Sequence, residues 1–182
     1  MNIEIYLPKV KDPFTYELLK ANVNWSGYEY VFGVLYLIAI VFSLLMFARR
    51  NILKGYFIIF SSTAILMFLF LPVLAPKIEG YTQDAPIEFY KSLKGKECYV
   101  RVLGFKSYAD LFYSQKPMHL SEQYIKKEYS ASFEEWLLKG NIDKPAYFVC
   151  KNTSAKKYLS NPGMLPLYQK NGFVFMKREA VR

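Results

Sequence analysis

Two long runs without a charged residue constrain the fold more than any other feature of the sequence. They cover residues 30–48 and 56–76. A helix needs about 20 consecutive apolar residues to cross the hydrocarbon core of a bilayer, and both runs come close to or exceed that length. Neither run alternates between polar and apolar residues as a half-buried strand would. We therefore expect two transmembrane helices, over residues 28–48 and 56–76, rather than two buried helices of a soluble protein.

A short basic segment, residues 49–55, joins the two runs. It contains Arg49, Arg50 and Lys54 and no acidic residue. Because the connection is short, the two helices must be antiparallel neighbours that form a hairpin. The positive-inside rule then places the basic loop in the cytoplasm. In the inner (cytoplasmic) membrane, both chain ends are then extracytoplasmic: an N-terminal segment over residues 1–27 and a domain over residues 77–182. The N-terminal segment lacks the apolar core of a signal peptide.

The region after Pro76 has the pattern of a small α/β domain. Residues 98–105 and 146–150 are typical of short strands, and each is followed by a helix with a Ser or Thr near its start. Two strand–helix units in succession predict a parallel strand pair with a right-handed crossover. The Asn171-Gly172 pair between two apolar segments predicts a C-terminal β-hairpin. The expected fold is thus a membrane α-helical hairpin followed by an extracytoplasmic α/β domain.

Two of the expected helices begin with a capping-box pattern. Ser107 precedes Asp110 and Ser132 precedes Glu135 at the three-residue spacing of that motif. In the first of these helices, Tyr108, Leu111 and Phe112 recur at helical spacing and form an apolar stripe. Such a stripe usually packs into the core.

The two cysteines are predicted to remain free and buried. Cys98 begins the first predicted strand, whereas Cys150 ends the second. In a parallel pair these positions lie at opposite ends of the sheet, which is too far apart for a disulfide bond.

The charge of the predicted domain suggests what it binds. From Lys77 onwards there are 18 Lys and Arg against 11 Asp and Glu. A basic domain beside a bilayer attracts anionic or phosphate-bearing lipids, although an ordinary solvated surface explains the excess equally well. No nucleic-acid-binding motif is present, so nucleic acid is not an expected partner.

The sequence offers three candidate contacts for a substrate or a lipid phosphate. Lys77 follows the second predicted membrane helix, and Lys106 and Tyr108 lie where a strand becomes a helix, a place that can bind an anion. An ordinary capped helix also explains the second pair. The single histidine, His119, and the absence of a CxxC or HExxH motif give no metal site, and no cofactor or catalytic residue is assigned.

The chain resembles the C-terminal end of bacterial polyprenyl-phosphate-dependent membrane glycosyltransferases, the superfamily of protein mannosyltransferases and the lipid A aminoarabinose transferase. The resemblance extends over most of the chain and is carried by LPVLAPKIEGYTQDAPIEFYKSLKGKECYVRVLGFKSYADLFY (residues 71–113), KPAYFV (144–149) and NGFVFMKR (171–178). It implies a cell-envelope protein whose extracytoplasmic domain helps to position a polyprenyl-phosphate sugar or its acceptor.

The catalytic residue of that family is not carried over to this chain. The family's essential acidic residue lies in the first external loop of a protein with many membrane helices, and this chain has no such loop. The resemblance therefore implies the C-terminal, non-catalytic part of a larger transferase. Such a part would come from a truncated reading frame, a split gene or a C-terminal piece of a longer enzyme, and its partners would be the remaining helices. The alternative is a freestanding two-helix membrane anchor that presents a basic α/β binding or scaffolding domain.

Overall fold

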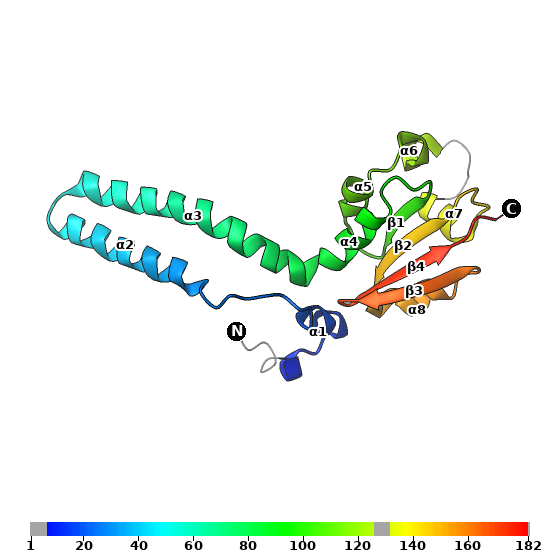
Figure 1. Ribbon diagram of the computed structural model, residues 1–182, viewed down its shortest axis with the longest axis horizontal. Helices are drawn as coiled ribbons and strands as arrows, with labels where there is room; N and C mark the ends of the chain where they lie inside the picture. The colour runs from blue at the N-terminus through cyan, green and yellow to red at the C-terminus, as the bar shows by residue number, and fades with distance from the viewer. Residues whose placement is uncertain (1–6, 126–131, 182) are drawn as a thin grey trace. The chain divides into compact units, whose positions relative to one another are not determined.

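A computed structural model describes residues 7–125 and 132–181, and the chain divides into two compact units. One unit holds residues 22–80, and the other holds the segment that ends at Ala21 together with the chain from Tyr81 onwards. Figure 1 shows the order of the elements along the chain. The helices are α1 (Pro13–Leu19), α2 (Tyr30–Ala48), α3 (Ile52–Thr82), α4 (Asp84–Ser92), α5 (Ala109–Ser114), α6 (Glu122–Ile125), α7 (Phe133–Lys139) and α8 (Ala155–Leu159). The strands are β1 (Tyr99–Leu103), β2 (Ala146–Lys151), β3 (Met164–Lys170) and β4 (Phe173–Arg178).

Helices α2 and α3 form the predicted hairpin (Figure 1), and both are long and apolar enough to cross a membrane. Helix α2 ends at Ala48 as expected. Helix α3 is longer than the predicted span, because it begins at Ile52 and continues past two internal prolines, Pro72 and Pro76, to Thr82. A proline removes one backbone donor but does not prevent the following turns from forming, so Pro76 was a poor marker of the end of this helix.

The two helices of the hairpin are joined by specific contacts. The Ser43 hydroxyl donates to the carbonyl oxygen of Gly55 at 2.8 Å, and a Cβ atom on Gly55 would lie 2.4 Å from the ring of Phe47. Further along, the hydroxyls of Tyr36 and Thr63 lie 2.9 Å apart, while Thr63 also donates to the Ile59 carbonyl. The glycine thus allows a close approach of the helices, and small polar groups connect them as they do in many membrane helix pairs.

The second unit is built on a mixed four-stranded sheet in the order β1-β2-β4-β3 (Figure 1). Strands β1 and β2 are parallel, with Tyr99 opposite Ala146 and Leu103 opposite Cys150, which confirms the predicted parallel pair. Strands β3 and β4 form the predicted C-terminal hairpin, and β4 pairs antiparallel with β2. The left-handed conformation of Asn171 and Gly172 at the turn fits the Asn-Gly signal.

Each face of the sheet carries its own hydrophobic core, and the two cysteines lie in different cores. Cys98 is buried with Phe89, Tyr90 and Phe175 on the face covered by α4. Cys150 is buried with residues of α7 and α8 on the other face. Both thiols are free, as predicted. The sequence argument placed them at opposite ends of the sheet, and the alternation of side chains along the strands also places them on opposite faces.

Helix α1 packs on the α/β unit. Its cap is formed by Asp12, whose carboxylate accepts from the backbone N–H of Thr15 at 2.8 Å. The ring of Phe14 meets the ring of Phe173 edge-on at 5.1 Å, and the Lys151 ammonium lies 4.6 Å from the centre of the Phe14 ring. Part of the predicted N-terminal segment, residues 1–27, therefore belongs to the α/β unit.

Helix α5 has the reverse of the predicted orientation. Tyr108, Leu111 and Phe112 are 79%, 60% and 72% exposed, whereas Asp110 and Ser114 are buried. The expectation that the apolar stripe packs into the core is therefore wrong. The inward position of Ser114 is possible because its hydroxyl donates to the Asp110 carbonyl within the helix.

The two predicted capping boxes have different outcomes. Ser132 caps α7, because its hydroxyl accepts from the backbone N–H of Glu135 at 3.2 Å. Ser107 does not cap α5 in the predicted way. The hydroxyl of Ser107 instead accepts from the N–H of Ala109 at 3.2 Å, and α5 begins at Ala109.

Candidate functional site

The segment from Gly104 to Tyr108 connects the carboxyl end of β1 to α5. Gly104 has a φ of +77°, and a Cβ atom there would lie 3.2 Å from the Tyr158 hydroxyl and 3.7 Å from the Ser154 hydroxyl. Glycine therefore lets the chain leave β1 directly against the segment that follows β2. Ligands of open α/β sheets bind at this edge, outside the carboxyl ends of the parallel strands.

A hollow of about 620 Å³ lies beside this segment. Its charged lining comes from β1, from the connecting segment and from three helices: Arg101, Lys106, Asp110, Glu122 and Glu134. A second hollow of about 490 Å³ shares Arg101, Glu122 and Glu134 with the first. The two hollows thus lie next to each other and share both a cationic and two anionic side chains.

Arg101 is held in place between these two hollows. One of its guanidinium nitrogens lies 3.1 Å from a carboxylate oxygen of Glu122, and the guanidinium centre lies 5.7 Å from the centre of the Phe133 ring. Arginine suits this position because its planar fork can stack on a ring and still bind a phosphate or carboxylate in two places.

Asp110 is the most unusual group in the lining of the hollow. Its side chain is 4% exposed, and within the described part of the chain its Oδ1 atom has no hydrogen-bond partner. Burial raises the pKa of this carboxyl group, although a backbone hydrogen bond from Leu111 and the positive charge of Arg101 act in the opposite direction. A buried carboxylate oxygen without a partner is uncommon, so Oδ1 of Asp110 marks the hollow as a place where a ligand or a water molecule can bind.

The hydroxyl group of Tyr90 is the second buried polar group in this part of the fold. It too lacks a hydrogen-bond partner among the residues described. Burial raises the pKa of Tyr90, and the nearby charge of Asp110 adds to the effect. Tyr90 therefore stays neutral and can donate a hydrogen bond.

Two of the three candidate contacts predicted from the sequence lie together. Lys106 and Tyr108 line the charged hollow and also a third, more apolar hollow of about 420 Å³ with Phe14, Lys151 and Phe173. Lys77 belongs to the other unit. It forms an ion pair with Glu29, and its ammonium lies 5.2 Å from the centre of the Trp25 ring. Any role of these three residues in binding remains a prediction.

Sequence reasoning missed Arg101 and Glu122 and assigned Asp110 to a helix cap. A signal for Asp110 was present in the sequence: Asp110 and Ser114 are four residues apart and so share one helical face, while the apolar residues of α5 share another. That pattern allows either face to be the buried one, and only the packing of α5 on α4 decides between them.

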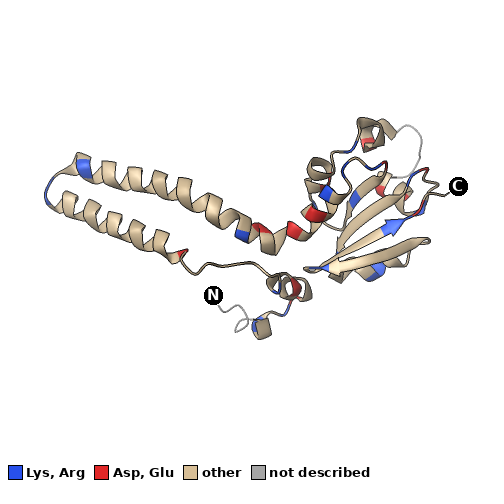
Figure 2. Cartoon of the chain, in the orientation of Figure 1, with Lys and Arg blue, Asp and Glu red and all other residues tan. Residues whose placement is uncertain are grey.

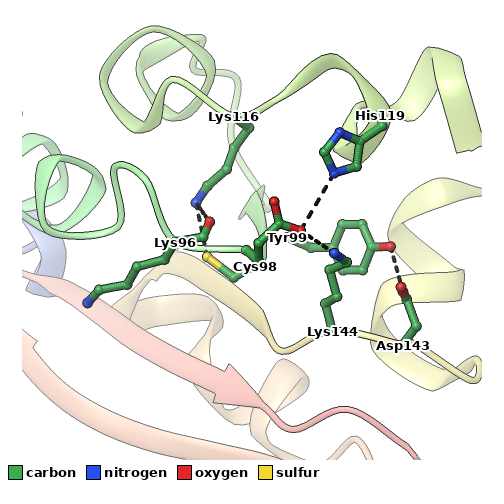
Figure 3. Close-up of polar contacts among 8 residues, drawn as sticks. Lys96, Cys98, Tyr99, Lys116, His119, Asp143 and Lys144 are labelled. Atoms are coloured by element: carbon green, nitrogen blue, oxygen red, sulfur yellow. Dashed lines mark hydrogen bonds and ion pairs between the residues drawn. The ribbon is translucent and has the colours of Figure 1, made fainter.

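A separate polar cluster lies at the start of β1 (Figure 3). Glu97 pairs with Lys144, and its carboxylate lies 3.6 Å from Nε2 of His119. The Tyr99 hydroxyl donates to Asp143 at 2.7 Å. The hydrogen bond from Lys144 lowers the pKa of Glu97. These contacts connect β1 to the segment that precedes β2, so the cluster has a structural explanation.

No group of three His, Cys, Asp or Glu side chains suitable for a metal ion occurs within residues 7–125 and 132–181. No protein-family model, curated protein or solved structure matches the chain. The choice of the charged hollow beside Gly104 as the candidate site therefore rests only on its geometry and its lining residues.

Proposed function

We propose that α2 and α3 span the cytoplasmic membrane and that the α/β unit lies on its extracytoplasmic side. Large apolar side chains cover both helices and are exposed, including Phe60 at 71% and Phe68 at 80%. A buried pair of core helices in a soluble protein would not have this exposure, and soluble proteins rarely expose so large an apolar area. A bilayer accounts for both the length and the exposure of these helices.

The proposed orientation depends on the distribution of charge around the hairpin. Basic residues lie at the turn between α2 and α3, as Figure 2 shows, and the helices themselves carry few charges. Basic turns of this length favour the cytoplasmic side. Both termini of the chain would then be extracytoplasmic.

For the α/β unit we propose a role as the C-terminal, non-catalytic part of a membrane glycosyltransferase that moves a sugar from a polyprenyl-phosphate donor to an extracytoplasmic acceptor. The observation that carries this proposal is the mixed lining of the charged hollow. Arg101 and Lys106 can bind a phosphate, the carboxylates of Asp110 and Glu122 can accept hydrogen bonds from sugar hydroxyls, and the exposed ring of Tyr108 can stack on an apolar face.

Binding of a polyprenyl-phosphate hexose to the full chain in lipid nanodiscs tests this role. Replacing Lys106 by Gln removes one charge-assisted contact, worth about 1.5–3 kcal/mol, and is expected to weaken binding roughly tenfold or more. The matched control is Lys156→Gln, because Lys156 is exposed on α8 and lines none of the three hollows. Absence of binding, or an equal loss in both variants, would contradict the proposal.

The non-catalytic part of the proposal has its own test. The full chain, given the same donor and an acceptor, is expected to release no sugar and to form no glycosylated product. Sugar transfer by this chain alone would show that it carries a catalytic centre.

The second candidate function is a freestanding membrane anchor that presents a basic binding or scaffolding domain. The exposed apolar face of α5 favours it, because surfaces of this kind commonly mark interaction sites. Purification of the chain from its own membranes would separate the candidates. Co-purification with a polytopic membrane protein that has an acidic first external loop supports the transferase role, and its absence supports the anchor.

A further inference from the structure

Helix α5 has apolar side chains on two sides: Ala109 and Tyr113 pack against the core, while others are exposed. We define the α5 surface as the side chains of Tyr108, Leu111 and Phe112. They are three and four residues apart, so they lie next to one another on one side of the helix. The opposite side carries the buried polar residues Asp110 and Ser114. Neighbouring exposed apolar side chains of this kind commonly mark an interaction site.

We propose that the α5 surface docks onto the bilayer that holds α2 and α3, at the level of the lipid headgroups. This inference rests on the membrane insertion proposed above. An aromatic and aliphatic face with lysines at its margin is the composition of helices that lie in the interfacial plane of a membrane.

Lysines lie beside the α5 surface and can attract anionic lipid, although Tyr108 and Leu111 also line the hollow that contains Glu122 and Glu134. Lys106 is exposed two residues before Tyr108, and the ammonium of Lys91 lies 5.2 Å from the centre of the Tyr113 ring on α5. The one acidic residue of α5, Asp110, is buried on the other side of the helix. A lysine near an anionic membrane surface adds to the attraction.

The connectivity of the chain also favours the bilayer as the partner. Helix α3 ends at Thr82 and α4 begins at Asp84, so one residue separates the second membrane helix from the helix against which α5 packs. A tether this short gives the α5 surface a high effective concentration at the membrane. A weakly amphipathic surface is then sufficient for docking, whereas a free partner protein would have to bind such a small surface from solution.

Site-specific fluorescence on the full chain tests this inference. Phe112→Cys, labelled with the fluorophore NBD, is reconstituted into vesicles of phosphatidylcholine and phosphatidylglycerol. Lys156→Cys on α8 is the matched surface control, and Phe60→Cys on α3 reports separately whether the hairpin is inserted. The native thiols of Cys98 and Cys150 are buried, and the unsubstituted chain measures any background labelling.

We expect lipids with a nitroxide near the headgroup to quench the probe at position 112 severalfold more than the probe at position 156. Aqueous iodide should quench position 112 less than position 156. Omission of phosphatidylglycerol should reduce the lipid quenching at position 112, and unchanged quenching would contradict the role of charge.

Equal quenching at positions 112 and 156, with position 60 quenched by deep nitroxide lipids, would overturn the docking proposal while leaving membrane insertion in place. Shielding of position 112 from both iodide and nitroxide lipids would overturn it in favour of contact with a second copy of the chain. Failure of deep nitroxide lipids to quench position 60 would overturn the membrane insertion itself, and the docking proposal with it.

Discussion

The side-chain ammonium of Lys116 lies 3.0 Å from the sulfur atom of Cys98 and donates to the carbonyl oxygen of Lys96 (Figure 3). The same ammonium also donates to the carbonyl oxygen of Leu93. All three donors of the lysine are therefore used. Two of the three acceptors are backbone carbonyls that follow the end of α4, and the Leu93 carbonyl also accepts from the backbone N–H of Lys96 at 3.1 Å. The hydrogen bonds of Lys116 thus connect the end of α4 to the start of β1.

Replacing Lys116 by Met should destabilise the α/β unit, because the methionine fills the space but removes a hydrogen bond from each of the two carbonyls, of which Leu93 keeps the N–H of Lys96. The expected loss is about 0.5–1.5 kcal/mol, the net contribution of a typical intramolecular hydrogen bond. Urea unfolding of the full chain in detergent micelles measures it. Lys139→Met is the control, since Lys139 is exposed and its pair with Glu135 spans 3.6 Å within one helix. Equal stability of the two variants would contradict the role assigned to Lys116.

A second prediction concerns Asp110 and its dependence on pH. Because burial raises the pKa of Asp110 in the folded chain, the folded state holds its proton more tightly than the unfolded state does. As the pH rises through the interval between the ordinary aspartate pKa and the raised one, the free energy of unfolding therefore falls.

The variant Asp110→Asn removes this dependence while it keeps the shape of the side chain. We expect it to be more stable than the parent chain above the raised pKa, with the advantage disappearing below the ordinary aspartate pKa. Urea unfolding at a series of pH values checks the prediction, with Glu135→Gln as a surface control. An advantage that grows as the pH falls would show that the sign is wrong.

A third prediction separates backbone strain from contact at Gly104. Gly104 and Gly95 have nearly equal positive φ angles, +77° and +76°, but only Gly104 has neighbours within 4 Å of an added Cβ. Alanine at either position is expected to lower the free energy of unfolding by about 1–3 kcal/mol, because a residue with a Cβ atom is strained in the left-handed backbone conformation. Gly104→Ala should cost more than Gly95→Ala, because its Cβ meets the Tyr158 hydroxyl. Tyr158→Phe should reduce that excess, and an excess that persists in the double variant would exclude the hydroxyl as its cause.

The cysteines provide a fourth prediction. The thiols of Cys98 and Cys150 lie in cores on opposite faces of the sheet, and burial raises the pKa of Cys150 to about 11. Neither thiol should react with iodoacetamide in the folded chain, and both should react after unfolding without a reductant. A mass lower by two hydrogens under oxidising conditions would indicate a disulfide and contradict the parallel pairing of β1 and β2.

The elements that the sequence predicted correctly are those set by local and unambiguous signals. The hairpin follows from two apolar runs and a short loop, the parallel pair follows from two strand–helix units, and the β-turn follows from Asn171-Gly172. The charged hollow depends instead on distant contacts. Arg101 meets Glu122 from another element, and Asp110 is buried only because α5 turns its polar side inward. Periodicity identifies the two faces of α5 but does not determine which one packs.

The hairpin itself offers the last prediction, in a comparison of Gly55 with Gly33. A Cβ on Gly55 would lie 2.4 Å from the ring of Phe47, whereas a Cβ on Gly33 meets nothing within 4 Å. Gly55→Leu should therefore force α2 and α3 apart near their turn and break the hydrogen bond from Ser43 to the Gly55 carbonyl. Hydrogen exchange of the full chain in nanodiscs should show faster exchange around the turn in this variant. Gly33→Leu should exchange like the parent chain, and equal protection in both variants would mean that close packing at Gly55 does not hold the hairpin together.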